Sequence, residues 1–168
     1  MGIPILTGAL LRSPAGILTD LYGGKPIYTG LLFVCAVPMY LLSHADSFWT
    51  FALCSAGFGL AGVSFSIGIA YSSAWYPRHR QGTVLGIFGA GNAGAALTTF
   101  FAPTLLNSIT DNGSNLEEWR QLPIYYAIMF IVLGITFATF AENKKTSSKA
   151  KTLNQMLRPL KDLRVWRF

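Results

Sequence analysis

Arg12 carries the most distinctive chemistry in this sequence, because it lies in the middle of the otherwise apolar run Leu6–Asp20. At a helical rise of about 1.5 Å per residue, Arg12 lies roughly 12 Å from Asp20, where the apolar run ends. That depth is near the centre of a hydrocarbon layer about 30 Å thick. The guanidinium stays charged inside proteins, and moving it to the bilayer centre costs at least a few kcal/mol. We therefore expect Arg12 to face the protein interior.

Small residues surround Arg12 at the helical positions three and four residues to either side, namely Gly8, Ala9, Ala15 and Gly16. Small residues on one face allow helices to pack closely in lipid. The face of the helix that carries Arg12 is thus expected to contact a neighbouring helix.

A buried arginine needs a negative partner, and the acidic residues of this chain do not provide one at mid-depth. Each of them is expected at a membrane boundary or in a loop: Asp20, Asp46, Asp111, Glu117, Glu118, Glu142 and Asp162. The counter-charge is either a group outside this sequence, which makes Arg12 structural, or a bound anion. Ionisable residues inside membranes usually serve function, which favours the anion.

Phe65 and Asn92 are expected in the same layer as Arg12. Counted from the ends of their predicted helices, Phe65 lies roughly 16 Å and Asn92 roughly 14 Å from the boundary on the side of Asp20. Taken alone, Phe65 is better explained by packing or lipid contact, and Asn92 is explained equally well by an interhelical hydrogen bond or by a ligand contact. Together with Arg12, they predict a shared anion-binding site.

The elements that position these residues are predicted to be membrane-spanning helices. Hydropathy indicates five apolar segments, each long enough to cross a bilayer. The predicted fold class is therefore all-α, a polytopic membrane helix bundle. The predicted spans are 3–19, 26–42, 48–76, 83–109 and 122–140.

The composition agrees with a membrane protein, since 52% of the residues are hydrophobic, only 12% are charged, and the mean hydropathy is +0.44. The net charge of +6 does not indicate nucleic-acid binding, because the basic residues lie in short loops and the C-terminal tail rather than on one folded face. Cys35 and Cys54 lack the spacing of metal ligands. We expect no cofactor, no metal and no enzymatic activity, since no nucleophile, base or carboxylate pair shares a plausible site.

Loop charges orient the predicted spans. Basic residues are concentrated in the segments 22–25 and 77–81 and in the tail after residue 142, whereas the segments 43–47 and 110–121 are mainly acidic. By the positive-inside rule, the first set is cytoplasmic. We expect a multi-pass protein of the cell (inner) membrane, with the N-terminus outside and the tail inside.

The sequence is interpreted as a fragment of a larger carrier. It enters a span at its first residues without a preceding helix, and its last residues, 165–168, are apolar and aromatic as if another span began. Residues 142–168 are expected to form a basic cytoplasmic linker containing a short amphipathic segment, Leu153–Leu163.

The segment Gly89–Gly94 matches the dinucleotide-binding pattern GxGxxG. That motif requires a preceding strand within a βαβ unit. Here the glycines belong to a long uncharged run among similar spans, so nucleotide binding is not expected.

Two glycine-rich segments, Gly16–Lys25 and Gly86–Gly94, make the sequence resemble the nitrate/nitrite porter family of the major facilitator superfamily. One resembles the superfamily's loop motif between helices two and three, and the other resembles the family's signature in helix five. The resemblance extends over nearly the whole chain, as helices two to six of a twelve-helix carrier. The positions concerned are Gly16, Asp20, Gly23, Gly24 and Lys25 in the loop motif, and Gly86, Gly89, Gly91 and Gly94 in the signature.

The resemblance implies roles for three residues. Arg12 corresponds to one of two arginines that hold nitrate at mid-membrane, Asn92 to an amide that donates a hydrogen bond, and Phe65 to an aromatic ring that stacks on the anion. Nitrate is planar, with three acceptor oxygens, and a guanidinium offers planar paired donors. The second arginine would belong to a missing C-terminal half of the carrier.

The resulting hypothesis is transport of nitrate or nitrite across the lipid bilayer by alternating access, with exchange or proton coupling. Two alternatives stay open: a carrier for another small anion such as a carboxylate, and a structural membrane module in which Arg12 pairs with another subunit.

Overall fold

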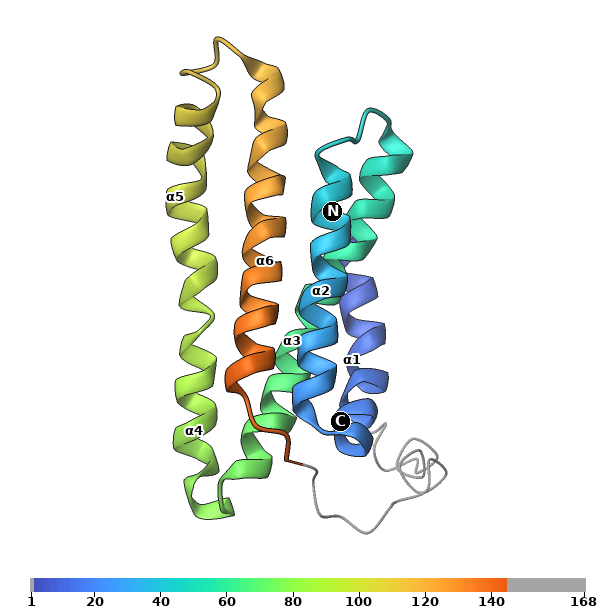
Figure 1. Cartoon of the computed structure of the whole chain (residues 1–168), viewed down its shortest axis with the longest axis vertical. Helices are drawn as coiled ribbons and strands as arrows, with labels where there is room; N and C mark the ends of the chain where they lie inside the picture. The colour runs from blue at the N-terminus through green and yellow to red at the C-terminus, as the bar shows by residue number, and fades with distance from the viewer. Residues whose placement is uncertain (1, 145–168) are drawn as a thin grey trace.

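The computed structural model describes residues 2–144, and within this range the regular secondary structure is helical (Figure 1). The all-α prediction is therefore confirmed. The linker beyond residue 144, including Leu153–Leu163, lies outside the described residues. The helices are α1 (Ile3–Tyr22), α2 (Gly24–Leu42), α3 (Phe48–Trp75), α4 (Arg78–Ala90), α5 (Ala93–Ile109), the short 3-10 helix η1 (Leu116–Arg120) and α6 (Gln121–Phe140).

Four segments of the described chain are long and apolar enough to cross a membrane. They are α2, α3, the combined α4–α5 segment Arg78–Ile109, and the segment Glu117–Phe140 that includes α6. Helix α1 is not among them, because Arg12 and Asp20 lower its mean hydropathy. The division into five spans stays a prediction. In it, α1 crosses the membrane because neighbouring helices pack against it.

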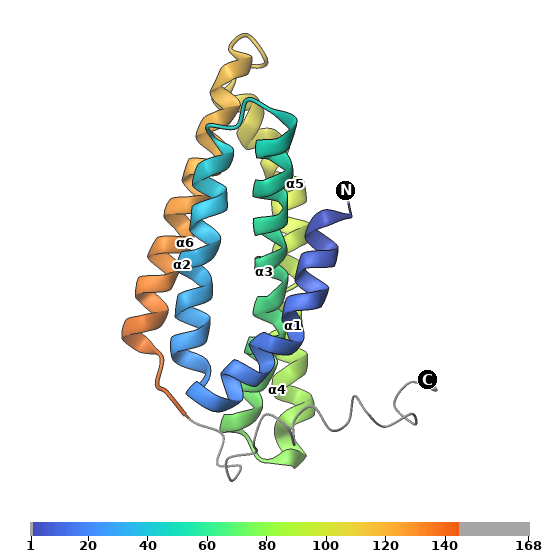
Figure 2. The ribbon, with the colours of Figure 1, turned by 90° about the vertical axis from the view of Figure 1, so that its right-hand side faces the viewer.

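Helices α2 and α3 form the centre of the bundle. Helix α1 packs along α3 and α6 packs along α2, so that α6, α2, α3 and α1 follow one another across the molecule (Figures 1 and 2). Helix α4 contacts α3, whereas α5 touches α6 only sparsely. The largest fully buried side chains are Val63 and Ile67 of α3.

The contact between α1 and α3 depends on two glycines. A Cβ atom on Gly8 would lie 2.8 Å from the carbonyl oxygen of Gly59, and one on Gly59 would lie 2.5 Å from the carbonyl oxygen of Pro4. This is the close packing expected of small residues on the Arg12 helix. It is limited to part of that face, since Ala9 is exposed and a Cβ on Gly16 would meet nothing within 4 Å.

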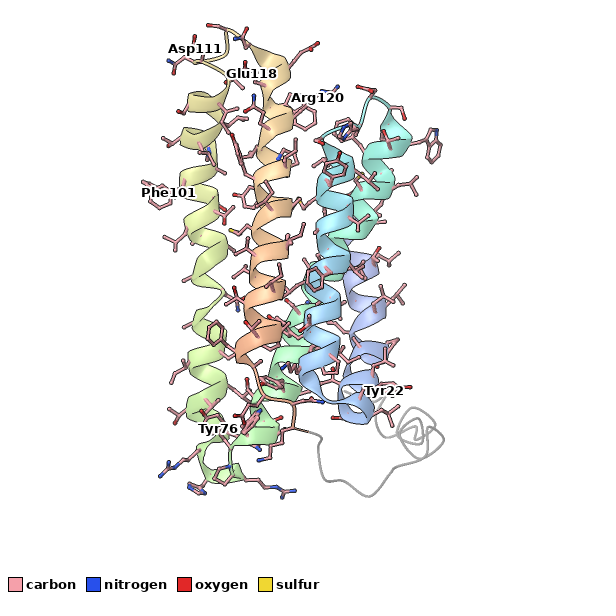
Figure 3. All side chains as sticks on the ribbon, in the orientation of Figure 1. Tyr22, Tyr76, Phe101, Asp111, Glu118 and Arg120 are labelled. Atoms are coloured by element: carbon pink, nitrogen blue, oxygen red, sulfur yellow. The ribbon has the colours of Figure 1, made fainter. Side chains whose placement is uncertain are left out.

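The loops gather at two ends of the bundle, as the charge pattern requires. Figure 3 shows Tyr22 and Tyr76 at one end, and Asp111, Glu118 and Arg120 at the other. At the second end, Arg120 forms an ion pair with Asp46 and donates a hydrogen bond of 2.9 Å to the carbonyl of Ser43. These contacts join the loop before α3 to the start of α6.

Candidate anion-binding site

The predicted span 83–109 contains a break at Gly91 and Asn92. The amides of these two residues bond to carbonyls three residues back, Gly91 to Phe88 and Asn92 to Gly89, each at 3.0 Å. Helix α4 therefore ends at Ala90, and α5 begins at Ala93. Interrupted helices at membrane depth are tolerated where they are covered by protein or line a cavity.

A cavity of about 510 Å³ lies beside this break. The structure brings together at this cavity all three residues expected to bind an anion: Arg12 from α1, Phe65 from α3 and Asn92 from the break. The remaining lining residues come from α2, α3, α4 and the break, namely Tyr28, Ala61, Gly62, Ser64, Phe88 and Gly91.

Arg12 is exposed at the cavity instead of being enclosed by the described helices. Its guanidinium nitrogen Nη2 lies 4.0 Å from the position of a Cβ atom on Gly62, so the Arg12 side chain reaches the surface of α3. Within residues 2–144 the ion pair is that of Arg120 with Asp46, and Arg12 has no carboxylate partner. The positive charge of Arg12 is thus available to a ligand of the cavity.

Asn92 occupies the N-cap position of α5, but its side chain forms no capping hydrogen bond. Serine, threonine, aspartate and asparagine at this position commonly accept a bond from the first helical turn. The capping bond would use only the Oδ1 acceptor, and among the described residues the Nδ2 group of Asn92 donates no hydrogen bond either, so both groups are available at the cavity.

Two aromatic rings form one wall of the cavity. Phe65 is 38% exposed, and its ring centroid lies 5.6 Å from that of Phe88. Phe88 packs on α3 at Gly68, where a Cβ atom would lie 2.1 Å from the ring. The sequence analysis identified Phe65 but missed Phe88. The signal that could have indicated Phe88 is Gly68, the glycine against which its ring packs.

Tyr28 was also missed. It lies near the start of α2, and its ring centroid is 4.9 Å from that of Phe137 on α6. Ser64 of α3 lines the same cavity. A phenolic hydroxyl within an otherwise apolar span was the available signal.

Comparison with known proteins identifies the family of this chain. The model of the Major Facilitator Superfamily matches residues 1–168. The chain belongs to the Major Facilitator Superfamily.

Its relatives in the superfamily have names that refer to nitrate or nitrite. The chain is 43% identical to the probable nitrate/nitrite antiporter NarK1 of Thermus thermophilus, 31% to a nitrite extrusion protein of Bacillus subtilis and 30% to the probable nitrate transporter NarT of Staphylococcus carnosus. These alignments cover 98–99% of the chain but 39–41% of the relatives. The chain thus spans about two fifths of the length of these curated relatives. No solved structure matches the chain.

The glycines of the predicted family signature lie on α4, at the break and on α5. A Cβ atom on Gly86, Gly89 or Gly94 would meet no atom within 4 Å, and one on Gly91 would meet only the carbonyl oxygen of Phe88. Among the described residues, this glycine face has no helix packed against it. Its role in packing stays a prediction.

Gly16 of the superfamily loop motif lies inside α1, the other residues of the motif lie near the junction of α1 and α2, and none of them lines the cavity. Gly23 has φ 92° and ψ 159°, a conformation that only glycine adopts readily. It is also crowded, because a Cβ atom on Gly23 would lie 2.1 Å from Oδ1 of Asn143 and one on Gly24 would lie 2.3 Å from the ring of Tyr71. These two glycines let the chain turn sharply beneath α3.

Proposed function

We propose that this chain is part of a membrane carrier of nitrate and/or nitrite, and that the cavity lined by Arg12, Phe65 and Asn92 is its anion-binding site. The observation that carries the proposal is the meeting of these residues, from three separate parts of the chain, around one cavity where Arg12 lacks a carboxylate partner among residues 2–144. The names of the superfamily relatives agree with this substrate class.

Each residue has a separate role toward a planar oxyanion. Arg12 offers paired, charge-assisted N–H donors, which match two oxygens of one anion. Asn92 adds a neutral amide donor. Phe65, backed by Phe88, offers a flat apolar surface that restricts the orientation of the anion.

The same features suit alternating access. When the cavity is empty, the charge of Arg12 is unneutralised, and closing the site around it would carry a desolvation cost. A bound anion removes much of that cost, so closure and reorientation are coupled to occupancy. This favours exchange of anions, while proton coupling would require a titratable group from the rest of the full-length protein.

In the proposed orientation, the end of the bundle with Tyr22 and Tyr76 faces the cytoplasm and the end with Asp111 faces outside, in the cell membrane. The remainder of the carrier would supply the opposite wall of the site, including a second cationic group. We propose that the chain has no enzymatic role, in agreement with relatives that are named for transport or extrusion.

The test is nitrate binding by the purified full-length protein that contains this chain, measured by calorimetry. Arg12→Gln is expected to abolish measurable binding. Arg12→Lys, which keeps the charge but loses the paired geometry, is expected to weaken it by about tenfold or more. Arg78→Gln is the matched control, because Arg78 is exposed at the start of α4, outside the cavity.

Full nitrate affinity in Arg12→Lys would contradict paired recognition. Tight binding of a carboxylate that nitrate does not displace would instead support a carrier for that class of anion. Unchanged binding in Arg12→Gln would leave Arg12 with only a structural role.

A further inference from the structure

Tyr28 connects the proposed anion site to α6. It lines the 510 Å³ cavity together with Arg12, and on its other side it lines an apolar groove of about 540 Å³ that includes Phe137. The close contact of the Tyr28 and Phe137 rings, with centroids 4.9 Å apart, fixes the position of the Tyr28 ring. The Tyr28 hydroxyl is therefore held at a defined place on the wall of the cavity that Ser64 also lines.

The Ser64 hydroxyl differs from several helical hydroxyls of the described chain, although Thr29 also has no hydrogen-bond partner. Thr19, Thr99 and Thr136 each donate to the carbonyl of the residue four positions back in their own helix, at 2.7–2.9 Å. Within the described residues Ser64 makes no such bond, and Tyr28 donates to no backbone carbonyl, although both residues line the cavity. Two hydroxyl groups thus retain donor capacity beside Arg12.

We propose that the Tyr28–Ser64 pair is a third, neutral donor arm of the anion site, and that it selects nitrate over nitrite. This inference rests on the proposed function. Nitrate has three acceptor oxygens and nitrite has two. If Arg12 binds two oxygens of the anion and Asn92 supports them, the hydroxyl pair meets the third oxygen, which only nitrate possesses.

The physical reason for selectivity is hydrogen-bond satisfaction. A hydrogen bond to a charged acceptor contributes more than one between neutral groups, and its loss leaves a desolvated polar atom behind. Nitrite leaves the hydroxyl pair facing no oxygen, so the pair contributes little to nitrite binding. Removing the hydroxyls should therefore weaken nitrate binding selectively.

The experiment compares nitrate and nitrite dissociation constants for the full-length protein and its variants. Tyr28→Phe keeps the ring on Phe137 and removes only the hydroxyl. It is expected to raise the nitrate Kd about tenfold while changing the nitrite Kd by less than about twofold. Ser64→Ala should shift the same ratio in the same direction, and Ser64→Thr, which keeps a hydroxyl, should restore it.

Tyr71→Phe is the matched control. Tyr71 also packs against Phe137, with ring centroids 5.8 Å apart, but its hydroxyl donates to the backbone carbonyl of Glu142 at 2.8 Å, outside the cavity. This variant is expected to leave both dissociation constants unchanged. Thermal unfolding of each variant verifies that the compared proteins are folded.

The outcomes separate this inference from the proposed function. If Arg12→Gln abolishes binding of both anions while Tyr28→Phe leaves the nitrate-to-nitrite ratio unchanged, the donor arm is wrong and the anion site stands. An equal loss for both anions in Tyr28→Phe also overturns the selectivity. If Arg12→Gln binds both anions normally, the proposed function itself fails.

Discussion

At the scale of single residues, the molecule combines a permanent charge with neutral partners. Arg12 lines the cavity without a carboxylate partner among residues 2–144, and Asn92 caps α5 without using its side chain. Polar groups that are not engaged within the fold are available to a ligand, since their hydrogen-bonding capacity otherwise goes unused.

The neutrality of Asn92 leads to a residue-scale prediction. Asn92→Asp would place a carboxylate at the same cavity as Arg12, where it would compete with the anionic ligand for the guanidinium. Nitrate affinity is expected to fall by about a hundredfold, a loss typical of a charged hydrogen bond combined with like-charge repulsion.

The measurement is nitrate calorimetry on the full-length protein, with Asn107→Asp as the control. Asn107 is an exposed residue of α5 that lies outside the cavity. Equal affinities of Asn92→Asp and the unaltered protein would show that the amide does not face the anion.

At the scale of helices, close contacts determine where the polar groups lie. Helix α1 can approach α3 because Gly8 and Gly59 have no side chains, and this approach brings Arg12 alongside Gly62. Phe88 likewise lies against α3 because Gly68 leaves space for its ring. The geometry of the cavity therefore depends on residues that do not touch a ligand.

Gly59 provides a test of this dependence. In Gly59→Ala, the new Cβ atom would lie 2.5 Å from the carbonyl oxygen of Pro4, a backbone atom that cannot rotate away. Helix α1 must shift, and overpacking of this kind costs about 1–3 kcal/mol. We expect a lower melting temperature together with weaker nitrate binding.

Gly30→Ala on α2 is the matched control, since a Cβ atom there would meet nothing within 4 Å and Gly30 lies outside the cavity. A Gly59→Ala protein with unaltered stability and affinity would show that α1 and α3 do not pack through this glycine.

The α1–α2 junction provides a second test at this scale. Gly23→Ala would force alanine into a conformation that only glycine adopts readily and would place its Cβ atom against Asn143. The strained backbone alone costs about 1–3 kcal/mol. The expected result is a lower melting temperature with nitrate affinity unchanged in the folded protein, because Gly23 lies outside the cavity.

Gly16→Ala belongs to the same loop motif and serves as its control. Gly16 is in the interior of α1, and its Cβ atom would meet nothing within 4 Å. Alanine is favoured over glycine in a helix by about 0.5–1 kcal/mol, so this variant should be as stable as the original protein or slightly more stable. Equal destabilisation by both substitutions would contradict the special role of the Gly23 backbone.

At the scale of the whole molecule, the described chain has extensive apolar surface. Helices α4 and α5 have no buried residue, and large side chains such as Ile87, Phe100 and Phe101 are more than half exposed. Figure 3 shows Phe101 pointing away from the bundle. We propose that lipid and the rest of the longer carrier cover these surfaces, in keeping with a chain that spans about two fifths of its relatives.

The proposed orientation can be tested by thiol labelling in intact cells. In a background with Cys35 and Cys54 replaced by alanine, Asn112→Cys should react with a membrane-impermeant maleimide added outside. His79→Cys, located at the opposite end of the bundle, should react only after permeabilisation. The reverse pattern would show that the chain is inserted the other way.

Much of the architecture follows from local properties of the sequence. Apolar segments of spanning length predicted the helices. Most of the predicted first and last residues agree with the helix bounds in the structure to within a few residues. Arg12 stood out because a charge in an apolar run is costly wherever the helix is placed. The roles of Phe65 and Asn92 came from the family resemblance, and their depth along the helices, which depends only on the helical rise, agreed with a shared layer.

Properties that depend on how distant segments meet were decided only by the tertiary structure. Helical periodicity does not tell which faces of two helices will be in contact, so Gly8 and Gly16 looked equivalent although only Gly8 packs against α3. The break at Asn92 and the positions of Tyr28 and Phe88 at the cavity likewise arise from contacts between helices. The sequence by itself determined the helices and the unusual charge; packing between them decided which side chains share the cavity.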